Sequence, residues 1–216
     1  MKREVFKVLR ELCERYPALR SCEQEIVSAF EQIASAYKNK GRLYLCGNGG
    51  SAADCEHIVG ELMKSFRLSR SLTQTEQAGF LSLGERGREA AKQLERGLPA
   101  LSLTSHIALS TAFANDRCPA FVFAQQLYVL GDGRDVLLAI TTSGNSENCI
   151  YAAVAAKAKG MQVVALTGAG GGEIKQYSDV CICVPETETF SVQELHLPVY
   201  HGLCAMLEAE FFSDNA

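Results

Sequence analysis

Apolar residues recur every three or four positions in two stretches near the start of the chain, residues 2–16 and 21–38. This spacing places the apolar side chains on one face of an α-helix, so both stretches predict amphipathic helices. A helical stretch also closes the sequence, at about residues 192–212. Between these ends the pattern changes to short apolar runs, which predict β-strands.

Five such runs predict the strands of one sheet, and helical patterns follow several of them, as at residues 52–66 and 147–159. Strands that alternate with helices form parallel sheets covered on both faces, because the crossovers are right-handed. The predicted fold class is α/β, a three-layer αβα sandwich with a parallel five-stranded sheet. The runs lie at residues 43–46, 100–104, 136–140, 163–166 and 180–184.

The length of 216 residues suits one hydrophobic core, so we expect residues 1–216 to form a single domain that includes the N-terminal helices at 1–40. Residues 67–98 break the alternation with a polar, charged segment, predicted as an insertion that is helical at about residues 85–95. Long inserts often act as lids or subunit contacts, and that role stays open beside a plain surface excursion.

Composition is that of an ordinary globular protein, with 47% hydrophobic residues and a net charge of -4. Because the charges are interspersed, neither nucleic acid nor an anionic membrane is expected as a principal partner. No run is long enough to span a bilayer, and the N-terminal residues lack the apolar core of a signal peptide. Nine scattered cysteines without CxxC spacing favour reduced thiols, and we expect a cytoplasmic protein.

A glycine cluster, GNGGS at residues 47–51, lies between a predicted strand and a predicted helix. Glycines permit close approach to the backbone, and a helix N-terminus offers unpaired N–H groups to an anion. The spacing also satisfies the loose dinucleotide pattern GxGxxG/A. The second strand, however, ends at residues 103–105 without the acidic residue that would hold a ribose. The cluster therefore favours a phosphate site.

A second loop, TTSGNS at residues 141–146, also joins a strand to a helix. Its hydroxyl groups, backbone amides and the positive end of the helix suit a phosphate dianion without any lysine. A single such loop is more often a plain turn with a capping serine. Two loops of this kind at the ends of strands in one sheet favour a real site.

Two pairs of polar residues suggest chemistry beside these loops. His57 and Glu61 are four residues apart on one helix face, which suits a solvated charge contact, a metal-ligand pair, or a base with its orienting partner. Gln193 and His201 lie two turns apart, about 12 Å on a straight helix, too far for one metal. A kink at Pro198 or contributions from different subunits would resolve this, or one of the two is no ligand.

Together these segments resemble the sedoheptulose 7-phosphate isomerases of the sugar isomerase (SIS) superfamily over about residues 20–212. The resemblance rests on CGNGGSAAD with HIVGE, on AND at residues 114–116, on TTSGNS, and on VQELHLPVYH. It implies a flavodoxin-like sheet with SIS topology, a homotetramer with active sites at subunit interfaces, and a phosphorylated sugar as substrate.

The resemblance also implies roles for individual residues. The substrate phosphate would be held by Ser51, Thr141, Thr142, Ser143 and Ser146, and the sugar would be surrounded by Asn48, Asp116 and Gln193. Gly49 and Gly50 are also expected to bind the substrate. The family's zinc ligands match His57, Glu61, Gln193 and His201. Glu61 and His201 would also be the proton-transfer pair.

The expected chemistry is the interconversion of a ketose and an aldose phosphate. A proton must move between adjacent carbons through an enediol, which needs a base at the carbon and an acid near the oxygens. We assign Glu61 as the base and His201 as the acid. One zinc ion per site would stabilise the developing negative charge.

The sequence departs from the family at three positions, and other functions remain possible. Thr141 stands where a serine is frequent and keeps the hydroxyl, Ser65 stands where an arginine is frequent, and Phe190 where an acidic residue is frequent. These changes bear on which sugar is bound, and an isomerase or etherase for another phosphosugar stays open. A non-catalytic SIS protein that binds a phosphosugar or the replication initiator is the alternative from another class. A zinc hydrolase is disfavoured, because HExxH is absent.

Overall fold

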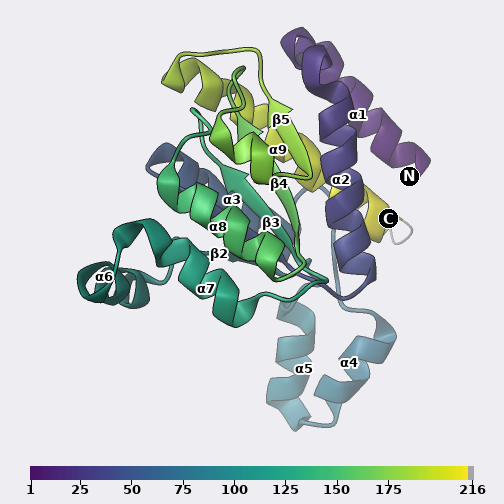
Figure 1. Cartoon of the computed structure of the whole chain (residues 1–216). Helices are drawn as coiled ribbons and strands as arrows, with labels where there is room; N and C mark the ends of the chain where they lie inside the picture. Colours follow the sequence, from purple (N-terminus) through teal and green to yellow (C-terminus); the bar gives the residue numbers. More distant parts are fainter. Residues whose placement is uncertain (214–216) are drawn as a thin grey trace.

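A parallel sheet of five strands forms the centre of the structure, a computed structural model in which residues 1–213 are described (Figure 1). The strand order β2-β1-β3-β4-β5 is that of flavodoxin-like sheets. Each position of β1 and β3 is buried, as expected for strands covered on both faces. The predicted α/β fold class is confirmed. The strands are β1 (Leu43–Gly47), β2 (Ala100–Ser102), β3 (Val136–Ile140), β4 (Gln162–Thr167) and β5 (Val180–Cys183).

Helices cover both faces of the sheet, and alternate strand residues point to opposite sides. Leu43 and Leu45 of β1 pack with the first layer, whereas Tyr44 and Cys46 pack with the second. The first layer consists of α1 (Arg3–Arg15), α2 (Glu23–Lys38), α3 (Gly50–Met63) and α9 (Thr189–Phe212). The second contains α7 (Val122–Leu130) and α8 (Glu147–Ala158).

Short elements connect these layers. The 3-10 helices η1 (Pro17–Cys22), η2 (Pro119–Phe121) and η3 (Glu173–Tyr177) fill turns, and α6 (Ile107–Asp116) lies at the periphery beyond α7 (Figure 1). The helix α9 runs as one element through Pro198. It packs against α1, α2 and α3, so the last helix holds the first layer together.

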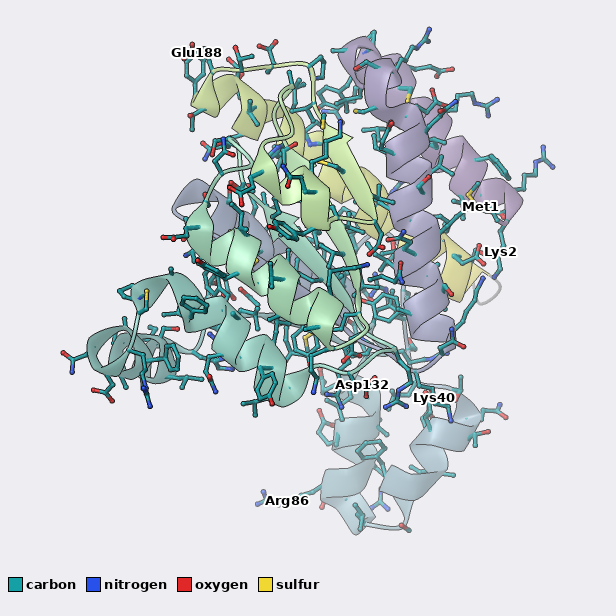
Figure 2. The ribbon with its side chains drawn as sticks, in the orientation of Figure 1. Met1, Lys2, Lys40, Arg86, Asp132 and Glu188 are labelled. Carbon is teal, nitrogen blue, oxygen red and sulfur yellow. The ribbon has the colours of Figure 1, made fainter. Side chains whose placement is uncertain are left out.

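The insertion forms a helical hairpin that projects from the sheet, made of α4 (Gln74–Leu81) and α5 (Gly84–Gln93) (Figure 1). An antiparallel bridge between Ser71 and Glu95 closes its base. Arg86 near the tip and Glu188 at the start of α9 lie at opposite ends of the molecule (Figure 2). The helix α5 agrees with the predicted helix at residues 85–95, whereas α4 was not predicted.

The cysteines are free thiols, and six of the nine are buried. Cys118 is exposed, while Cys181 and Cys183 are half-buried on the edge strand β5. The expectation of core cysteines therefore holds for most of them. Within residues 1–213, no helix has the length and apolar character that a membrane crossing requires.

Candidate active site

The two glycine and hydroxyl loops lie side by side at the carboxyl edge of the sheet. Gly47 at the end of β1 pairs in register with Ile140 at the end of β3. Between these two strands the order of the sheet reverses, and ligands of open α/β sheets bind at such a point. The side chains of Asn48 and Asn148 exchange two hydrogen bonds of 2.8 Å, which ties the first loop to α8.

Backbone geometry explains the glycines and the buried serine of the first loop. Gly49 has a φ of 55°, a left-handed conformation that glycine adopts without strain, and α3 begins at the next residue. Ser51 is only 3% exposed in the first turn of α3. A Cβ on Gly50 would lie 2.7 Å from Nε2 of Gln193, so this side chain of α9 packs directly over the loop.

Hydroxyl groups and a tight turn shape the second loop. The Oγ1 of Thr141 and the Oγ of Ser146 are 2.9 Å apart, and Ser143 Oγ accepts the backbone N–H of Asn145 at 3.1 Å. Gly144 has a φ of 69°, and a Cβ there would collide with the carbonyl oxygen of Gly171. The loop leads into α8, whose first-turn N–H groups face the same edge of the sheet.

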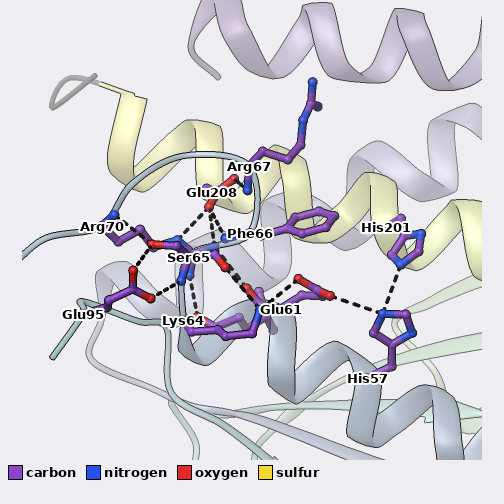
Figure 3. Close-up of polar contacts among 11 residues, drawn as sticks. His57, Glu61, Lys64, Ser65, Phe66, Arg67, Arg70, Glu95, His201 and Glu208 are labelled. Atoms are coloured by element: carbon purple, nitrogen blue, oxygen red, sulfur yellow. Dashed lines mark hydrogen bonds and ion pairs between the residues drawn. The ribbon is translucent and has the colours of Figure 1, made fainter. Parts of the chain in front are cut away.

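Three predicted side chains meet between α3 and α9 (Figure 3). His57 Nε2 lies 3.2 Å from Glu61 Oε1 and 3.4 Å from His201 Nε2. The Glu61 side chain is 15% exposed, against 44% for His57, so this carboxylate is largely removed from water. The sequence left three interpretations of the His57 and Glu61 pair: a solvated charge contact, a metal-ligand pair, or a base with its orienting partner. The burial of Glu61 disfavours the solvated charge contact.

Burial shapes the electrostatics of this cluster. It lowers the pKa of His201, and the adjacent His57 lowers it further, while Glu61 acts in the opposite direction. His201 is therefore neutral at neutral pH. Lys64 approaches Glu61 from solvent, with Nζ 3.8 Å from Oε2. The cluster borders an open groove of about 630 Å³ between α1 and α9, to which Leu12, Leu197 and His201 contribute.

Two predicted site residues lie apart from this cluster within the single chain. Gln193 lies at the glycine loop, two turns of α9 before His201. Asp116 ends α6, where its Oδ1 accepts a hydrogen bond from Asn115 at 3.0 Å and its side chain is exposed. Figure 1 shows α6 at the periphery of the fold, and the sugar-binding role of Asp116 remains a prediction.

Sequence reasoning missed several residues that support the site. Tyr200 contacts both His57 and Asp54, and the only hint was its place beside His201. Asn148 follows TTSGNS by two residues and gave no separate pattern. His106 has a structural partner, since its Nδ1 lies 2.5 Å from Gln126 Oε1.

The donor chemistry of the cluster fits zinc. Two imidazoles and a carboxylate are the ligands that zinc prefers, and tetrahedral ligands at about 2.1 Å lie about 3.4 Å from one another. The spacings of 3.2 and 3.4 Å around His57 Nε2 agree with that separation. Among residues 1–213, however, no group of three or more His, Cys, Asp and Glu side chains forms a ready-made metal site.

Comparison with known proteins agrees with the fold and with the predicted family. The family model described as SIS domain matches residues 6–96 and 90–168. The phosphoheptose isomerase of Roseiflexus sp. is 36% identical over 189 residues, 88% of this chain and 83% of its own. That of Thiobacillus denitrificans is 41% identical over 172 residues, 78% of this chain and 75% of its own.

Solved structures show the same relationship. The phosphoheptose isomerase of Neisseria gonorrhoeae superposes with a TM-score of 0.71 at 32% identity, over 94% of this chain and 97% of its own. That of Francisella tularensis gives a TM-score of 0.74 at 28% identity, over 94% and 93% of the two chains. The chain therefore belongs to the phosphoheptose isomerase family of SIS-domain proteins.

Proposed function

We propose that this phosphosugar isomerase converts sedoheptulose 7-phosphate to D-glycero-heptose 7-phosphate through an enediol. The observation that carries the proposal is the cluster of His57, Glu61 and His201, two of whose members lie on the helix that begins at the first of the two loops suited to phosphate. The relatives of similar length are named phosphoheptose isomerases, which supports a heptose phosphate as the substrate.

Phosphate binding would orient the substrate. Hydroxyl groups of Ser51, Thr141 and Ser146 and the first-turn N–H groups of α3 and α8 lie at the carboxyl edge of the sheet. Such groups stabilise a dianion without a lysine. Because the phosphate is remote from the reacting carbons, its binding energy serves to place those carbons against the acid and base. We assign the same role to Thr142 and Ser143, assign contacts with the sugar to Asn48, Asp116 and Gln193, and expect Gly49 and Gly50 to bind the substrate through their backbone.

Proton transfer is assigned to two residues of the cluster. Glu61 removes the proton from the carbon next to the carbonyl, since its carboxylate is mostly shielded from water and held against His57. His201 exchanges a proton with the substrate oxygens, because a neutral imidazole carries one N–H donor and one acceptor. The two residues come from α3 and α9, which pack against each other.

A zinc ion would be held by His57, Glu61 and His201, with Gln193 as the fourth ligand predicted from the family resemblance. When bound, it would supply a Lewis acid that stabilises negative charge on the substrate oxygens. Gln193 would have to move from its position over Gly50, or the ligands would come from two subunits.

Assembly into a homotetramer is part of the proposal. Ile107 and Leu109 of α6 and Val129 of α7 are exposed apolar side chains beside a groove lined mostly by apolar atoms. Exposed apolar patches of this kind are typical of subunit interfaces. Association would also be the means by which Asp116 reaches an active site.

The test is an NMR assay of purified, zinc-loaded protein with sedoheptulose 7-phosphate in heavy water. New aldose signals with deuterium at C2 are expected, and both Glu61→Gln and His201→Gln should remove most turnover while the oligomer stays intact. Full activity of either variant would overturn the mechanism. Saturable binding without conversion would instead favour a non-catalytic phosphosugar-binding protein, and conversion of another phosphosugar would correct the substrate.

A further inference from the structure

Cys181 and Cys183 form a pair of thiols on β5, and no step of the proposed mechanism uses them. Their Sγ atoms are 3.6 Å apart. Alternate residues of a strand point to the same side, so both side chains leave the same face of the sheet. The strand β5 is the last in the order of the sheet, and both residues are half-buried. The pair therefore lies at the margin of the core, where an ion from solvent can reach it.

The spacing of the two residues disfavours a disulfide between them. A disulfide requires Cβ atoms about 3.5–4.5 Å apart. Two steps along an extended strand cover about 6.6 Å, and parallel side chains keep that separation at Cβ. Burial also raises the pKa of Cys181 to about 11, so this thiol is protonated at neutral pH and is a weak nucleophile. Formation of a disulfide would be slow and would distort β5.

A single bridging ion fits the same pair without distortion of the strand. Zinc binds thiolates at about 2.3 Å, so two thiolates of one tetrahedral ion lie about 3.8 Å apart. The observed separation of 3.6 Å between the sulfur atoms is close to this value. The hydroxyl oxygen of Thr167 contacts both sulfur atoms, at 3.6 Å from Cys181 and 3.5 Å from Cys183. Soft ions prefer sulfur ligands of this kind.

An open groove of about 490 Å³ gives access to the two thiols, which both line it. Residues of η1 and α2 form the opposite wall, among them Cys22 and Glu25. The charged residues of the groove are Glu25, Lys175 and Asp179, so no excess of positive charge repels a cation. The groove therefore admits an ion to the pair.

We propose that Cys181 and Cys183 form a chelating site for one thiophilic divalent ion, of the class of zinc and cadmium, at the edge of the sheet. Its thiols belong to β5, whereas the active-site cluster belongs to α3 and α9. Among residues 1–213, no third His, Cys, Asp or Glu side chain completes the pair, so water or a small thiol fills the other positions of the ion. Binding displaces the thiol protons, since the thiolate is the ligand.

The test is a titration of the reduced, metal-free, full-length protein with cadmium chloride near neutral pH. Cadmium bound to thiolates gives a charge-transfer absorption in the ultraviolet, which the nitrogen and oxygen ligands of the active-site cluster do not produce. We expect this absorption to saturate at one equivalent. Cys181→Ser and Cys183→Ser should each weaken the binding about 100-fold or more, because the second bond of a chelate forms within one molecule. The matched control is Cys118→Ser, which removes an exposed thiol and should leave the titration unchanged.

A second probe is phenylarsine oxide, which reacts with a dithiol. Two As–S bonds form, and the oxide oxygen leaves as water with the two thiol protons, so arsenic stays trivalent. Mass spectrometry after digestion should place one adduct on the peptide that contains Cys181 and Cys183. Unchanged cadmium affinity in both serine variants, or an adduct found only on other cysteines, would overturn the proposal. The adduct is located in the wild type, so this readout decides even where a variant fails to fold, and neither probe depends on turnover of any sugar.

Discussion

Arg70 and Glu208 form a fully buried ion pair, with Nη2 of the arginine 2.8 Å from Oε1 of the glutamate and side-chain exposures of 0% and 1%. The guanidinium also donates to the backbone carbonyls of Leu62 at 2.7 Å and Glu61 at 3.1 Å. These carbonyls belong to the last turns of α3, while Glu208 belongs to α9 (Figure 3). The pair therefore fixes the backbone of Glu61 relative to the helix that carries His201.

Removal of this arginine is expected to lower both stability and turnover. Arg70→Met should reduce the free energy of unfolding by about 3–5 kcal/mol, because Glu208 would remain as a buried charge without its partner. In urea unfolding, the control Arg67→Met should change stability by about 1 kcal/mol or less, since that side chain is 50% exposed. The folded fraction of Arg70→Met should also show a lower kcat. Equal stability of the two variants would contradict this interpretation.

Gly50→Ala tests the contact between the glycine loop and Gln193. The new methyl carbon would lie 2.7 Å from Nε2 of Gln193, so the amide must move. If this amide binds sugar or metal, kcat/KM should fall about tenfold, a loss of roughly 1.4 kcal/mol of transition-state stabilisation.

Gly60→Ala in the same helix is the control, because a Cβ there meets no atom within 4 Å. It should retain activity and stabilise the helix by up to about 1 kcal/mol. An unchanged kcat/KM in Gly50→Ala would show that the contact of the Gln193 amide with Gly50 is not needed for binding sugar or metal.

Local patterns explain what the sequence predicted correctly. The strands, the two loops and the pairing of His57 with Glu61 each arise within a few residues, where spacing alone determines which side chains share a face. Contact between Arg70 and Glu208 joins positions 138 residues apart and has no local pattern. Contact between Tyr200 and His57 is likewise set by the packing of α9 on α3.

The helix α4, which apolar spacing does not predict, carries a local start signal in the sequence. Thr73 and Glu76 form a capping box, the spacing that commonly starts a helix. Its apolar residues are not arranged along one buried face, and none of its residues is buried. Hydrophobic periodicity predicted the longer helices, but it does not predict α4, because α4 has no apolar face.

His196 predicts a specific dependence of stability on pH. The side chain is fully buried, and among the described residues its two nitrogens have no hydrogen-bond partner. Burial lowers its pKa to about 4, although the backbone of Thr167 acts in the opposite direction. The unfolded chain takes up a proton near pH 6.5, whereas the folded protein does not until about pH 4. The free energy of unfolding therefore decreases as pH falls from about 6.5 towards 4. Relative to neutral pH, His196 lowers it by about 2 kcal/mol at pH 5.

His196→Leu should remove that part of the pH dependence. The measurement is urea unfolding of wild type and variant at pH 7.5 and pH 5, and the loss of stability between the two values should be about 2 kcal/mol smaller in the variant. The substitution can also change the free energy of unfolding at both pH values. This does not affect the test, because each protein's stability at pH 5 is compared with its own stability at pH 7.5. An identical loss in both proteins would show that His196 becomes protonated while the protein is folded.

The helical hairpin should be dispensable for the fold of the chain. The helix α4 contains no buried residue, and in α5 only Gly87 and Ala91 are buried, with Gly87 packed against the carbonyl of Phe80 in α4. Replacement of residues 74–93 by a short Gly-Ser linker leaves the bridge between Ser71 and Glu95 to close the base. The ion pair of Arg96 with Glu76 would be lost, at a cost of about 1 kcal/mol or less at this exposure. Unfolding by urea should therefore show nearly wild-type stability.

The activity and the oligomeric mass of the deletion variant distinguish two possible roles of the hairpin, a subunit contact and a part of a neighbouring subunit's active site. The tip of the hairpin lies at the opposite end of the molecule from the start of α9, whose Gln193 contacts the glycine loop, so the hairpin is not expected to close over that loop in its own chain (Figure 2). The deletion variant should therefore keep its kcat/KM if each chain acts without the hairpin of another. We expect this outcome, together with an unchanged mass in analytical ultracentrifugation. A smaller mass would identify the hairpin as a subunit contact, and a lower kcat at unchanged mass would mean that it completes the active site of a neighbouring subunit.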